Sequence, residues 1–239
     1  MLSKSQIKLI TSLKQKKYRQ QHNFFVVEGV KAITELLQSN LELHKLYTTQ
    51  SFNINSKDEV IISETDLKRI SFLTTPNKAL AVFKIPEQKP IDNSGLIVAL
   101  DSIRDPGNLG TIIRLCDWFG VKELICSKET VDCFNPKVIQ ATMGSITRVH
   151  VSYIDLDFFL STVKLPVFGA FMEGENVYKA SLPKQGVLVM GNEANGVSEK
   201  IEAMITKKIS IPRFGDLKVT ESLNVATATA VLLSEFRRE

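Results

Sequence analysis

Arg114 is the first residue whose type and position call for a chemical explanation. It follows an apolar run at 96–100, which is short and rich in branched residues and therefore predicts a strand buried on both faces. A helix is predicted to follow, with Asn108 as its N-cap and Gly120 just beyond its end. Arg114 lies opposite the apolar face of that helix, so core packing does not explain it. It is either a solvated helix-face arginine or a cation that binds an anion.

Two further polar segments occur later in the chain, and the first of them follows a predicted buried strand. The run 186–190 leads into a glycine-bracketed loop, GNEANG, at 191–196. Near the C-terminus, 209–212 leads through a longer loop to ESLNV at 221–225, and a helix is predicted over 222–238. Strands that alternate with helices indicate a mostly parallel sheet, whose ligand sites lie beyond the carboxyl ends of its strands. All of these polar segments are expected at that edge.

Together these segments resemble a known family. Asn108 with Arg114 six residues later, GNExxG at 191–196, and IP at 211–212 followed by SLNV at 222–225 resemble the three motifs of the SpoU (TrmH-type) RNA ribose 2′-O-methyltransferases of the SPOUT superfamily. The order and spacing of the motifs match. The resemblance implies an α/β domain with a trefoil-knotted parallel sheet, a topology that general connection rules do not predict. It also implies transfer of a methyl group from S-adenosyl-L-methionine to a ribose 2′-hydroxyl.

The family resemblance assigns cofactor contacts to the second and third motifs. Glycine at 191 allows the main chain to approach a ligand, and two apolar side chains can sandwich an adenine. Without the motifs, the two apolar residues, Ile211 and Leu223, would be read as core. The residues expected to bind the cofactor are Met190, Gly191, Ile211, Pro212 and Leu223.

The resemblance also assigns catalytic roles. Arg114 is expected to stabilise the developing alkoxide and to grip the adjacent phosphate, because a guanidinium is ill suited to accept a proton. Asn108 would orient the loop or contact the ribose. Glu193 would hold Arg114 or shape its own loop, unless it is a solvated surface acid. Ser222 and Asn224 would line the substrate pocket, although helix capping explains both equally well.

The sequence before 96 has a different organisation. Alternating helices and strands over about eighty residues predict a small α/β domain. The segment FFVVEG at 24–29 resembles the start of the RNA substrate-binding domain of many SpoU relatives, which is similar in fold to a ribosomal RNA-binding protein; otherwise Glu28 and Gly29 simply end a strand. The predicted division is an RNA-binding domain at 1–86, a linker at 87–95 and the knotted methyltransferase domain at 96–239.

Charge suggests an anionic partner. The chain has a net charge of +4, and residues 1–20 hold several basic residues but no acidic one. The basic face of an N-terminal helix would suit an RNA backbone, or it is a solvated amphipathic helix. Gln140 stands where many relatives have an arginine, which weakens one expected RNA contact. The candidate RNA-binding residues are Lys14, Lys16, Lys17, Arg19, Lys137 and Arg148; the last two also fit an ordinary surface.

Composition excludes several classes of protein. The chain is 44% hydrophobic and 23% charged, and it lacks the roughly 18 consecutive apolar residues of a membrane helix. No signal-peptide pattern, nucleotide-binding GxGxxG turn or P-loop is present. The scattered cysteines and histidines give no disulfide framework and no metal site. A cytoplasmic protein without a membrane or DNA partner is expected.

Several alternatives remain open at this point. Relatives with such an N-terminal domain act mostly on ribosomal RNA, but a tRNA 2′-O-methyltransferase fits the same motifs. A catalytically silent RNA-binding or ribosome-assembly relative would be expected to lack Arg114, Asn224 or the GNE loop, and all are present. A base or small-molecule methyltransferase is less compatible with SLNV and the N-terminal domain. The resemblance implies a homodimer through the knotted domain.

Overall fold

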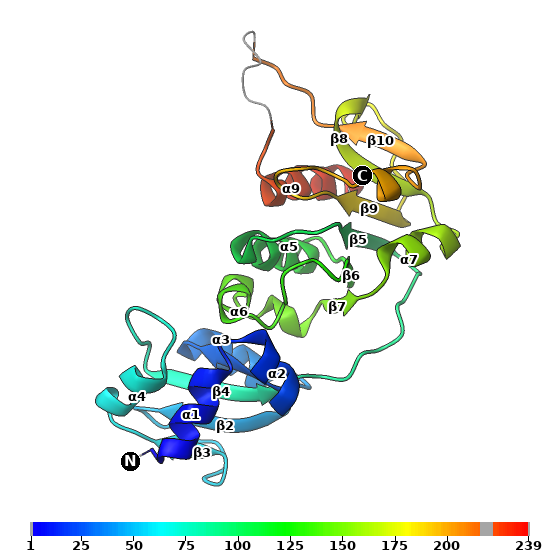
Figure 1. Cartoon of the computed structure of the whole chain (residues 1–239). Helices are drawn as coiled ribbons and strands as arrows, with labels where there is room; N and C mark the ends of the chain where they lie inside the picture. The colour runs from blue at the N-terminus through cyan, green and yellow to red at the C-terminus, as the bar shows by residue number, and fades with distance from the viewer. Residues whose placement is uncertain (1, 216–221, 239) are drawn as a thin grey trace. The chain divides into compact units, whose positions relative to one another are not determined.

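The computed structural model describes residues 2–215 and 222–238 of the chain (Figure 1). Contacts between residues divide the protein into two compact units. The first unit contains the chain up to residue 88 together with 132–147, and the second contains 89–131 together with 148–239. No helix within the described ranges is both long and apolar enough to cross a membrane.

The first unit is built on a mixed four-stranded sheet with the strand order β1-β4-β2-β3. Its β1 pairs antiparallel with β4, and so does β2, whereas β2 and β3 are parallel. The strands are β1 (Phe24–Glu28), β2 (Leu43–Thr48), β3 (Glu59–Ile61) and β4 (Ala79–Lys84), and the helices are α1 (Lys4–Ser12), α2 (Lys16–His22), α3 (Val30–Leu37), α4 (Glu64–Ile70), α6 (Pro136–Thr142) and the 3₁₀ helix η1 (Ser145–Thr147).

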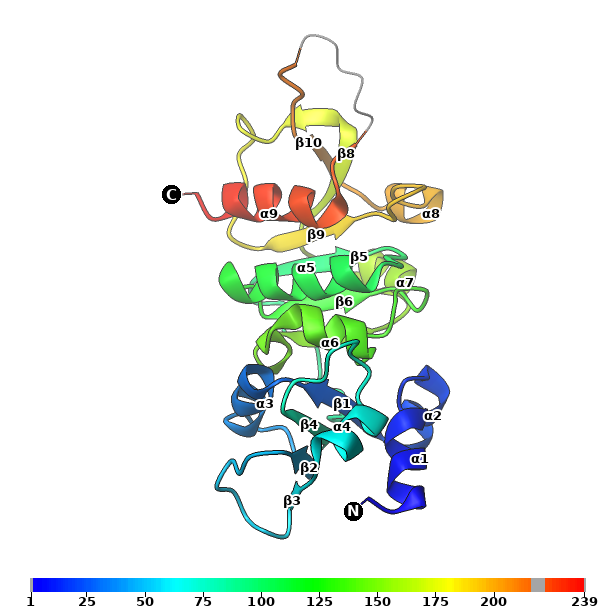
Figure 2. The ribbon, with the colours of Figure 1, turned by 90° about the vertical axis from the view of Figure 1, so that its left-hand side faces the viewer.

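Strand alternation separates two cores in the first unit. Val26 of β1 packs with apolar residues of α1 and α4, whereas Phe25 and Val27 pack with α3 on the opposite face. Figure 2 shows α1 and α3 on opposite sides of this sheet. Strand β1 lies at an edge of the sheet, so the side of β1 that faces away from β4 is available to a further element. Helix α6 packs beside β1.

The division into units departs from the sequence prediction at residues 132–147, which were assigned to the 96–239 domain. Phe134 packs against the ring of Phe25, with the ring centroids 4.8 Å apart. Ile139 of α6 is buried in the α3-side core. These residues group with the first unit because their apolar side chains are buried there, a contact that sequence order does not reveal.

The second unit is an α/β structure with six parallel strands in the order β10-β8-β9-β5-β6-β7, which confirms the predicted parallel sheet. The trefoil knot stays a prediction. The strands are β5 (Leu96–Leu100), β6 (Glu123–Cys126), β7 (His150–Tyr153), β8 (Val167–Asn176), β9 (Gly186–Met190) and β10 (Lys207–Ser210), and the helices are α5 (Pro106–Trp118), α7 (Leu156–Thr162), α8 (Glu199–Glu202) and α9 (Val225–Phe236).

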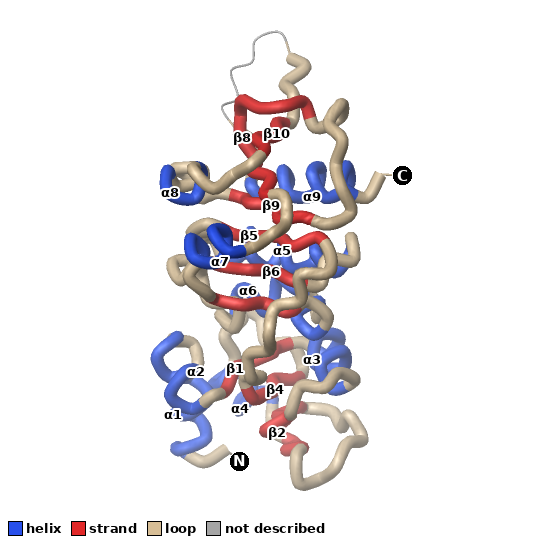
Figure 3. Tube along the Cα trace, turned by 90° about the vertical axis from the view of Figure 1, so that its right-hand side faces the viewer, coloured by secondary structure: helices blue, strands red, loops and turns tan. Residues whose placement is uncertain are grey.

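Helices cover both faces of the second sheet. Alternate residues of β5, Ile97 and Ala99, are buried with α7 and α8. Helices α5 and α9 pack together on the other face, as Figures 2 and 3 show from opposite sides. At their far ends, Nε of Arg237 donates to the carbonyl of Phe119 at 2.8 Å. The C-terminal helix is therefore held along the helix that carries Arg114.

The ends of α5 confirm one sequence prediction and correct another. Gly120 follows the helix with φ of +66°, the left-handed conformation that a glycine C′ residue adopts readily. Asn108, however, is not the N-cap. Asp105 caps the helix by accepting from the backbone N–H of Asn108 at 2.8 Å, and Pro106 occupies the first turn. Asn108 is thus the third residue of α5, within its first turn, which leaves its side chain free for another partner.

Candidate active site

The three motif segments follow the carboxyl ends of strands in the second sheet. Residues after β5 lead into α5, the GNEANG loop follows β9, and Ile211 follows β10. Strands β5 and β9 are neighbours, and Leu100 pairs with Met190 at their carboxyl ends. The backbone N–H of Asp101 donates to the carbonyl of Met190 at 2.9 Å, which joins the first two segments where the strands end. This is the edge at which parallel sheets place ligand sites.

A chain of side-chain hydrogen bonds joins all three motifs. Nδ2 of Asn108 donates to Oε1 of Glu193 at 2.9 Å, and Nδ2 of Asn224 donates to Oδ1 of Asn108 at 2.9 Å. Asn108 therefore lies between the second and third motifs and uses both ends of its amide. Glu193 lies 85 positions from Asn108 in the sequence and Asn224 lies 116 positions from it, yet both contact the Asn108 side chain. The predicted role of Asn108 in orienting the loop agrees with this arrangement.

The start of α9 fixes the direction of this hydrogen-bond chain. Oδ1 of Asn224 accepts from the backbone N–H groups of Ala226 and Thr227, so Asn224 is the N-cap of α9. Its amide nitrogen must then face Asn108, which in turn directs its own amide nitrogen to Glu193. Sequence reasoning offered capping and a site role for Asn224 as alternatives, and the side chain caps the helix while it joins the motifs.

Glu193 shapes its loop, which is one of the two roles that the resemblance implied. Its carboxylate accepts from Asn108 and lies 3.4 Å from the backbone nitrogen of Arg104. The alternative role, holding Arg114, is wrong for the described residues, because Arg114 makes no hydrogen bond or ion pair with any of them. The guanidinium lies on the exposed side of α5 and is available to an anionic ligand.

Two residues that sequence reasoning missed hold the GNEANG loop. Oδ1 of Asn192 accepts from the backbone of Ala194 and Asn195, and its Nδ2 donates to the carbonyl of Ser102 at 2.6 Å. Asp101 is buried, and its Oδ2 accepts from the backbone N–H of Ser198 at 2.8 Å. An acid directly after a fully buried strand was a signal that could have identified Asp101.

Gly191 is required by the loop itself. A Cβ at this position would lie 2.2 Å from the carbonyl carbon of Gly196 and from the nitrogen of Val197. The loop closes on Gly191 through paired hydrogen bonds between Asn192 and Gly196, at 2.8 and 2.9 Å. Glycine at 191 was predicted to admit a ligand, but the space beside its Cα is filled by the chain's own backbone. A larger residue would force the loop open.

The residues expected to bind a cofactor differ in exposure. Met190 is buried, Ile211 and Pro212 are half-buried, and Leu223 is 49% exposed. Core packing therefore does not explain Leu223, and an exposed leucine beside Asn224 provides an apolar surface of the kind that an adenine ring contacts. Ser222 is also exposed. Residues 216–221, which include Glu221 and most of the longer third-motif loop, lie outside the described ranges.

One candidate RNA contact is wrong. Arg19 is 1% exposed and is paired with Asp132, with Nε and Nη2 at 2.9 and 2.5 Å from Oδ2. Its Nη1 donates to the carbonyls of Leu13 and Lys14, so the guanidinium is used inside the first unit. Among the other candidates, Arg148 is exposed and its Nε donates to the carboxylate of Asp117. The four remaining candidates have exposed side chains; they are Lys14, Lys16, Lys17 and Lys137.

Comparison with known proteins agrees with this arrangement. The model of the SpoU rRNA methylase family matches residues 95–234, and the model of the MRM3-like substrate-binding domain matches residues 4–81. The curated 23S rRNA (guanosine(2553)-2′-O)-methyltransferase RlmP of Bacillus subtilis is 28% identical over 93% of this chain and 92% of its own length.

Solved structures with the same fold cover nearly the whole chain. A protein assigned to the TrmH family of RNA methyltransferases from Porphyromonas gingivalis has a TM-score of 0.91 and 38% identity, with 99% of this chain and 98% of that chain covered. The AdoMet-bound rRNA methyltransferase from Sinorhizobium meliloti has a TM-score of 0.88 and 28% identity, with 99% and 96% covered. The chain carries the three motifs and the parallel-sheet fold, and it belongs to the SpoU rRNA methylase family.

Proposed function

We propose that this protein is an RNA methyltransferase that transfers a methyl group from S-adenosyl-L-methionine to a ribose 2′-hydroxyl in ribosomal RNA. The observation that carries the proposal is the hydrogen-bond chain from Glu193 through Asn108 to Asn224. It fixes three motif segments around the first turns of α5, next to an exposed Arg114. A site that only packs the fold would not need an unpaired arginine beside such an ordered polar network.

The cofactor would lie between the second and third motifs. The backbone around Met190 and Gly191 would hold its polar groups, and Ile211 and Leu223, next to Pro212, would contact its adenine. Their positions fit such a ligand, because Leu223 offers exposed apolar surface next to Asn224, which is joined through Asn108 to Glu193 of the GNEANG loop. When bound, the sulfonium supplies an electrophilic methyl group. Because the recognition uses the main chain, single side-chain substitutions here are expected to have modest effects.

Arg114 would do the chemical work that this chain contributes. The 2′-oxygen would gain negative charge as its hydroxyl proton leaves, and it would then bond to the methyl carbon as the bond from that carbon to sulfur breaks. A guanidinium a few ångströms away lowers the energy of that charge, and its planar fork also binds the neighbouring phosphate. Since arginine stays protonated, the proton passes to a substrate phosphate or to water rather than to Arg114. Ser222 would line the ribose pocket.

The first unit would bind the RNA. It matches a substrate-binding domain, and its exposed Lys14, Lys16 and Lys17 would contact phosphates without reading sequence. Lys137 would add to this binding. In the second unit, Arg148 would contact a phosphate once it exchanges Asp117 for that phosphate. Ribosomal RNA is favoured over tRNA because a relative that matches 93% of this chain is named as a 23S rRNA methyltransferase. We further propose that the enzyme is a cytoplasmic homodimer, assembled through the knotted methyltransferase domain.

Methyl transfer to defined RNA pools tests this function. The purified protein and its Arg114→Ala variant would be given tritiated S-adenosyl-L-methionine with ribosomal RNA or bulk tRNA, each lacking its modifications. Label in an alkali-resistant dinucleotide from ribosomal RNA, lost in the variant, is the expected result. Label in tRNA alone would redirect the assignment to tRNA, and no label despite cofactor binding would favour a silent RNA-binding relative.

A further inference from the structure

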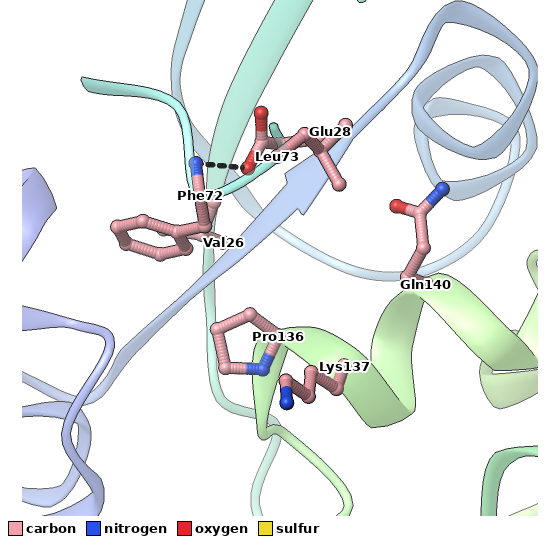
Figure 4. Close-up of a pocket in the computed structure, with 7 residues that line it drawn as sticks. All are labelled: Val26, Glu28, Phe72, Leu73, Pro136, Lys137 and Gln140. Carbon is pink, nitrogen blue, oxygen red and sulfur yellow. Dashed lines mark hydrogen bonds between the residues drawn. The ribbon is translucent and has the colours of Figure 1, made fainter. Parts of the chain in front are cut away.

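A small open pocket in the first unit is lined by none of the motif residues. Its volume is about 190 Å³, small for a ligand site and suited to one planar ring system rather than a whole nucleotide. Three segments form its walls, namely β1, the chain that follows α4, and the first turns of α6 (Figure 4). The lining residues are Val26, Glu28, Phe72, Leu73, Pro136, Lys137 and Gln140.

Glu28 is the buried polar residue among those that line this pocket. It is 6% exposed, accepts from the backbone N–H of Phe72 at 2.7 Å and accepts from Oγ of Ser71 at 2.5 Å. Each carboxylate oxygen therefore has one protein donor and keeps a second lone pair. Burial raises the pKa of Glu28, although hydrogen bonds from Ser71 and Phe72 lower it. Further donors from a ligand would stabilise a carboxylate that the protein alone solvates incompletely.

The remaining walls suit a flat heterocycle. Phe72 provides an aromatic ring, with Pro136 and Val26 as further apolar surface, and bases stack readily on such rings. Lys137 and Gln140 of α6 are exposed and belong to the pocket lining, where they offer N–H donors and one positive charge. The set contains one buried pair of acceptors, an aromatic platform and peripheral donors.

The pocket is fixed by contacts inside the first unit. The buried ion pair of Arg19 with Asp132 and the packing of Phe134 on Phe25 hold the segment that precedes α6. Gly29 has φ of +96° and is the N-cap of α3 immediately after Glu28, so the direction of the chain leaving the pocket depends on glycine. Pre-organised walls lower the entropic cost of binding.

We propose that this pocket binds an unstacked guanine base of the substrate RNA, with the carboxylate of Glu28 accepting from guanine N1–H and N2–H₂, Phe72 stacking on the ring, and Gln140 donating to O6. The proposal rests on the proposed function, because it takes RNA as the substrate. It adds base recognition in the first unit to a phosphate contact from Lys137.

Base chemistry gives the pocket its selectivity. On its Watson–Crick edge, guanine has two adjacent donors that match the two oxygens of a carboxylate. Adenine and cytosine place an acceptor beside their amino group, and uracil has one N–H between two carbonyl oxygens. An acceptor that faced Glu28 would leave a buried carboxylate unpaired, a mismatch that costs far more than the loss of a surface contact.

Binding of short labelled RNAs to the full-length protein tests the proposal. Fluorescence anisotropy would be measured with the pentaribonucleotides UUGUU, UUAUU and UUIUU, where I is inosine, which keeps N1–H but lacks the 2-amino group. We expect UUGUU to bind about 10-fold more tightly than UUAUU, with UUIUU between them. Equal affinity for the three RNAs would overturn the proposal without any variant.

Variants locate the preference in the pocket. Glu28→Gln keeps an oxygen for the N–H of Phe72 but loses one acceptor, so UUGUU and UUIUU should bind alike. Glu64→Gln, the same change at an exposed position of α4 in the same unit, should keep the wild-type order. Phe72→Leu should weaken all three RNAs by removing the stack. A guanine preference that survives in Glu28→Gln, with circular dichroism confirming the fold of both variants, would place the recognition elsewhere.

Two further measurements complete the test. The first shows whether the pocket binds a base within RNA or a free nucleotide, and the second distinguishes failure of the guanine site from failure of the proposed function. Guanosine monophosphate is added as a competitor: weak competition fits a base within RNA, whereas competition as strong as that of UUGUU would assign the pocket to a free nucleotide and overturn this proposal. Anisotropy needs no methyl transfer. If wild type binds UUGUU selectively but methylates no RNA, the proposed function fails and the guanine site stands. If it methylates ribosomal RNA without any guanine preference, the reverse holds.

Discussion

Arg19 in the first unit and Arg114 in the second unit are both helical arginines, yet their surroundings are opposite. Arg19 is 1% exposed, and its donors are used by Asp132 and by two backbone carbonyls. Arg114 lies on the exposed side of α5 and has no partner among the described residues. The buried arginine is part of the fold because its charge is fully compensated, whereas the exposed one keeps its donors for a ligand.

The largest effect is expected from Asp132→Ala. Removing the carboxylate leaves the guanidinium of Arg19 buried without its counter-charge, so unfolding of the first unit should become easier by about 3–5 kcal/mol. Urea denaturation at neutral pH measures the loss. Asp117→Ala removes the half-buried partner of the exposed Arg148 and is the matched control, with a cost below about 1 kcal/mol. Equal losses in the two variants would contradict the structural role of Arg19.

Arg114→Ala should leave stability unchanged and reduce methyl transfer by about 10²–10³-fold, because one donor to the developing oxyanion is lost. Arg114→Lys should recover part of the rate, since it restores the charge without the planar fork. Lys164→Ala is the control, an exposed cation before the amino end of β8 and away from the motif loops. Single-turnover rates and urea midpoints are the measurements. A destabilised Arg114→Ala would show that the arginine resembles Arg19 after all.

Asn224→Asp sharpens the comparison within the site. The aspartate keeps an oxygen to cap α9 but loses the amide donor to Asn108, so the link between the motifs breaks while the helix start is preserved. We expect stability within about 0.5 kcal/mol of wild type and methyl transfer lowered about 10-fold or more through misplaced loops. Asn224→Ala should add about 1 kcal/mol of destabilisation from the lost cap. Wild-type activity in Asn224→Asp would show that the hydrogen-bond chain is dispensable.

The smallest effect concerns the pH dependence of stability from Glu28. Its pKa is raised by burial, so the folded protein binds the proton more tightly than the unfolded chain. This contribution is fully present below the ordinary carboxyl pKa and is lost as the pH rises through the raised value. In the acidic range, wild type should therefore lose stability relative to Glu28→Gln as pH increases. Urea midpoints at a series of pH values check this, and parallel curves for the two proteins would contradict it.

Local patterns were sufficient to predict most elements of the second unit. The continuous apolar runs at 96–100 and 186–190 are buried strands of a parallel sheet, and the turn chemistry around Gly120 ends α5 as expected. These features depend on neighbours in sequence and on the burial of branched side chains. The short helix α8 was missed because four residues carry too little periodicity for a helix to be recognised.

Roles that depend on distant partners could not be read from residue type. Basic composition made Arg19 a candidate for RNA binding, since nothing near it in sequence shows that Asp132 will meet it. Asn108 was predicted to be the N-cap of α5 because asparagine favours that position. Asp105, three residues earlier, is an equally suitable residue and takes the role in the structure. The pocket around Glu28 combines segments from three parts of the first unit, so no single sequence motif could identify it.

The sequence by itself determined the three motifs, their order, and the parallel α/β architecture that places them at one edge of a sheet, because short-range periodicity and residue chemistry specify strands, helices and turns. Tertiary structure alone decided which polar side chains bond to other groups of the protein and which remain available to a ligand. Asn108 lies between Glu193 and Asn224, Arg19 is enclosed with Asp132, and Arg114 is left exposed. Burial and hydrogen-bond partnership are properties of residues that meet in space, and one-dimensional spacing does not encode them directly.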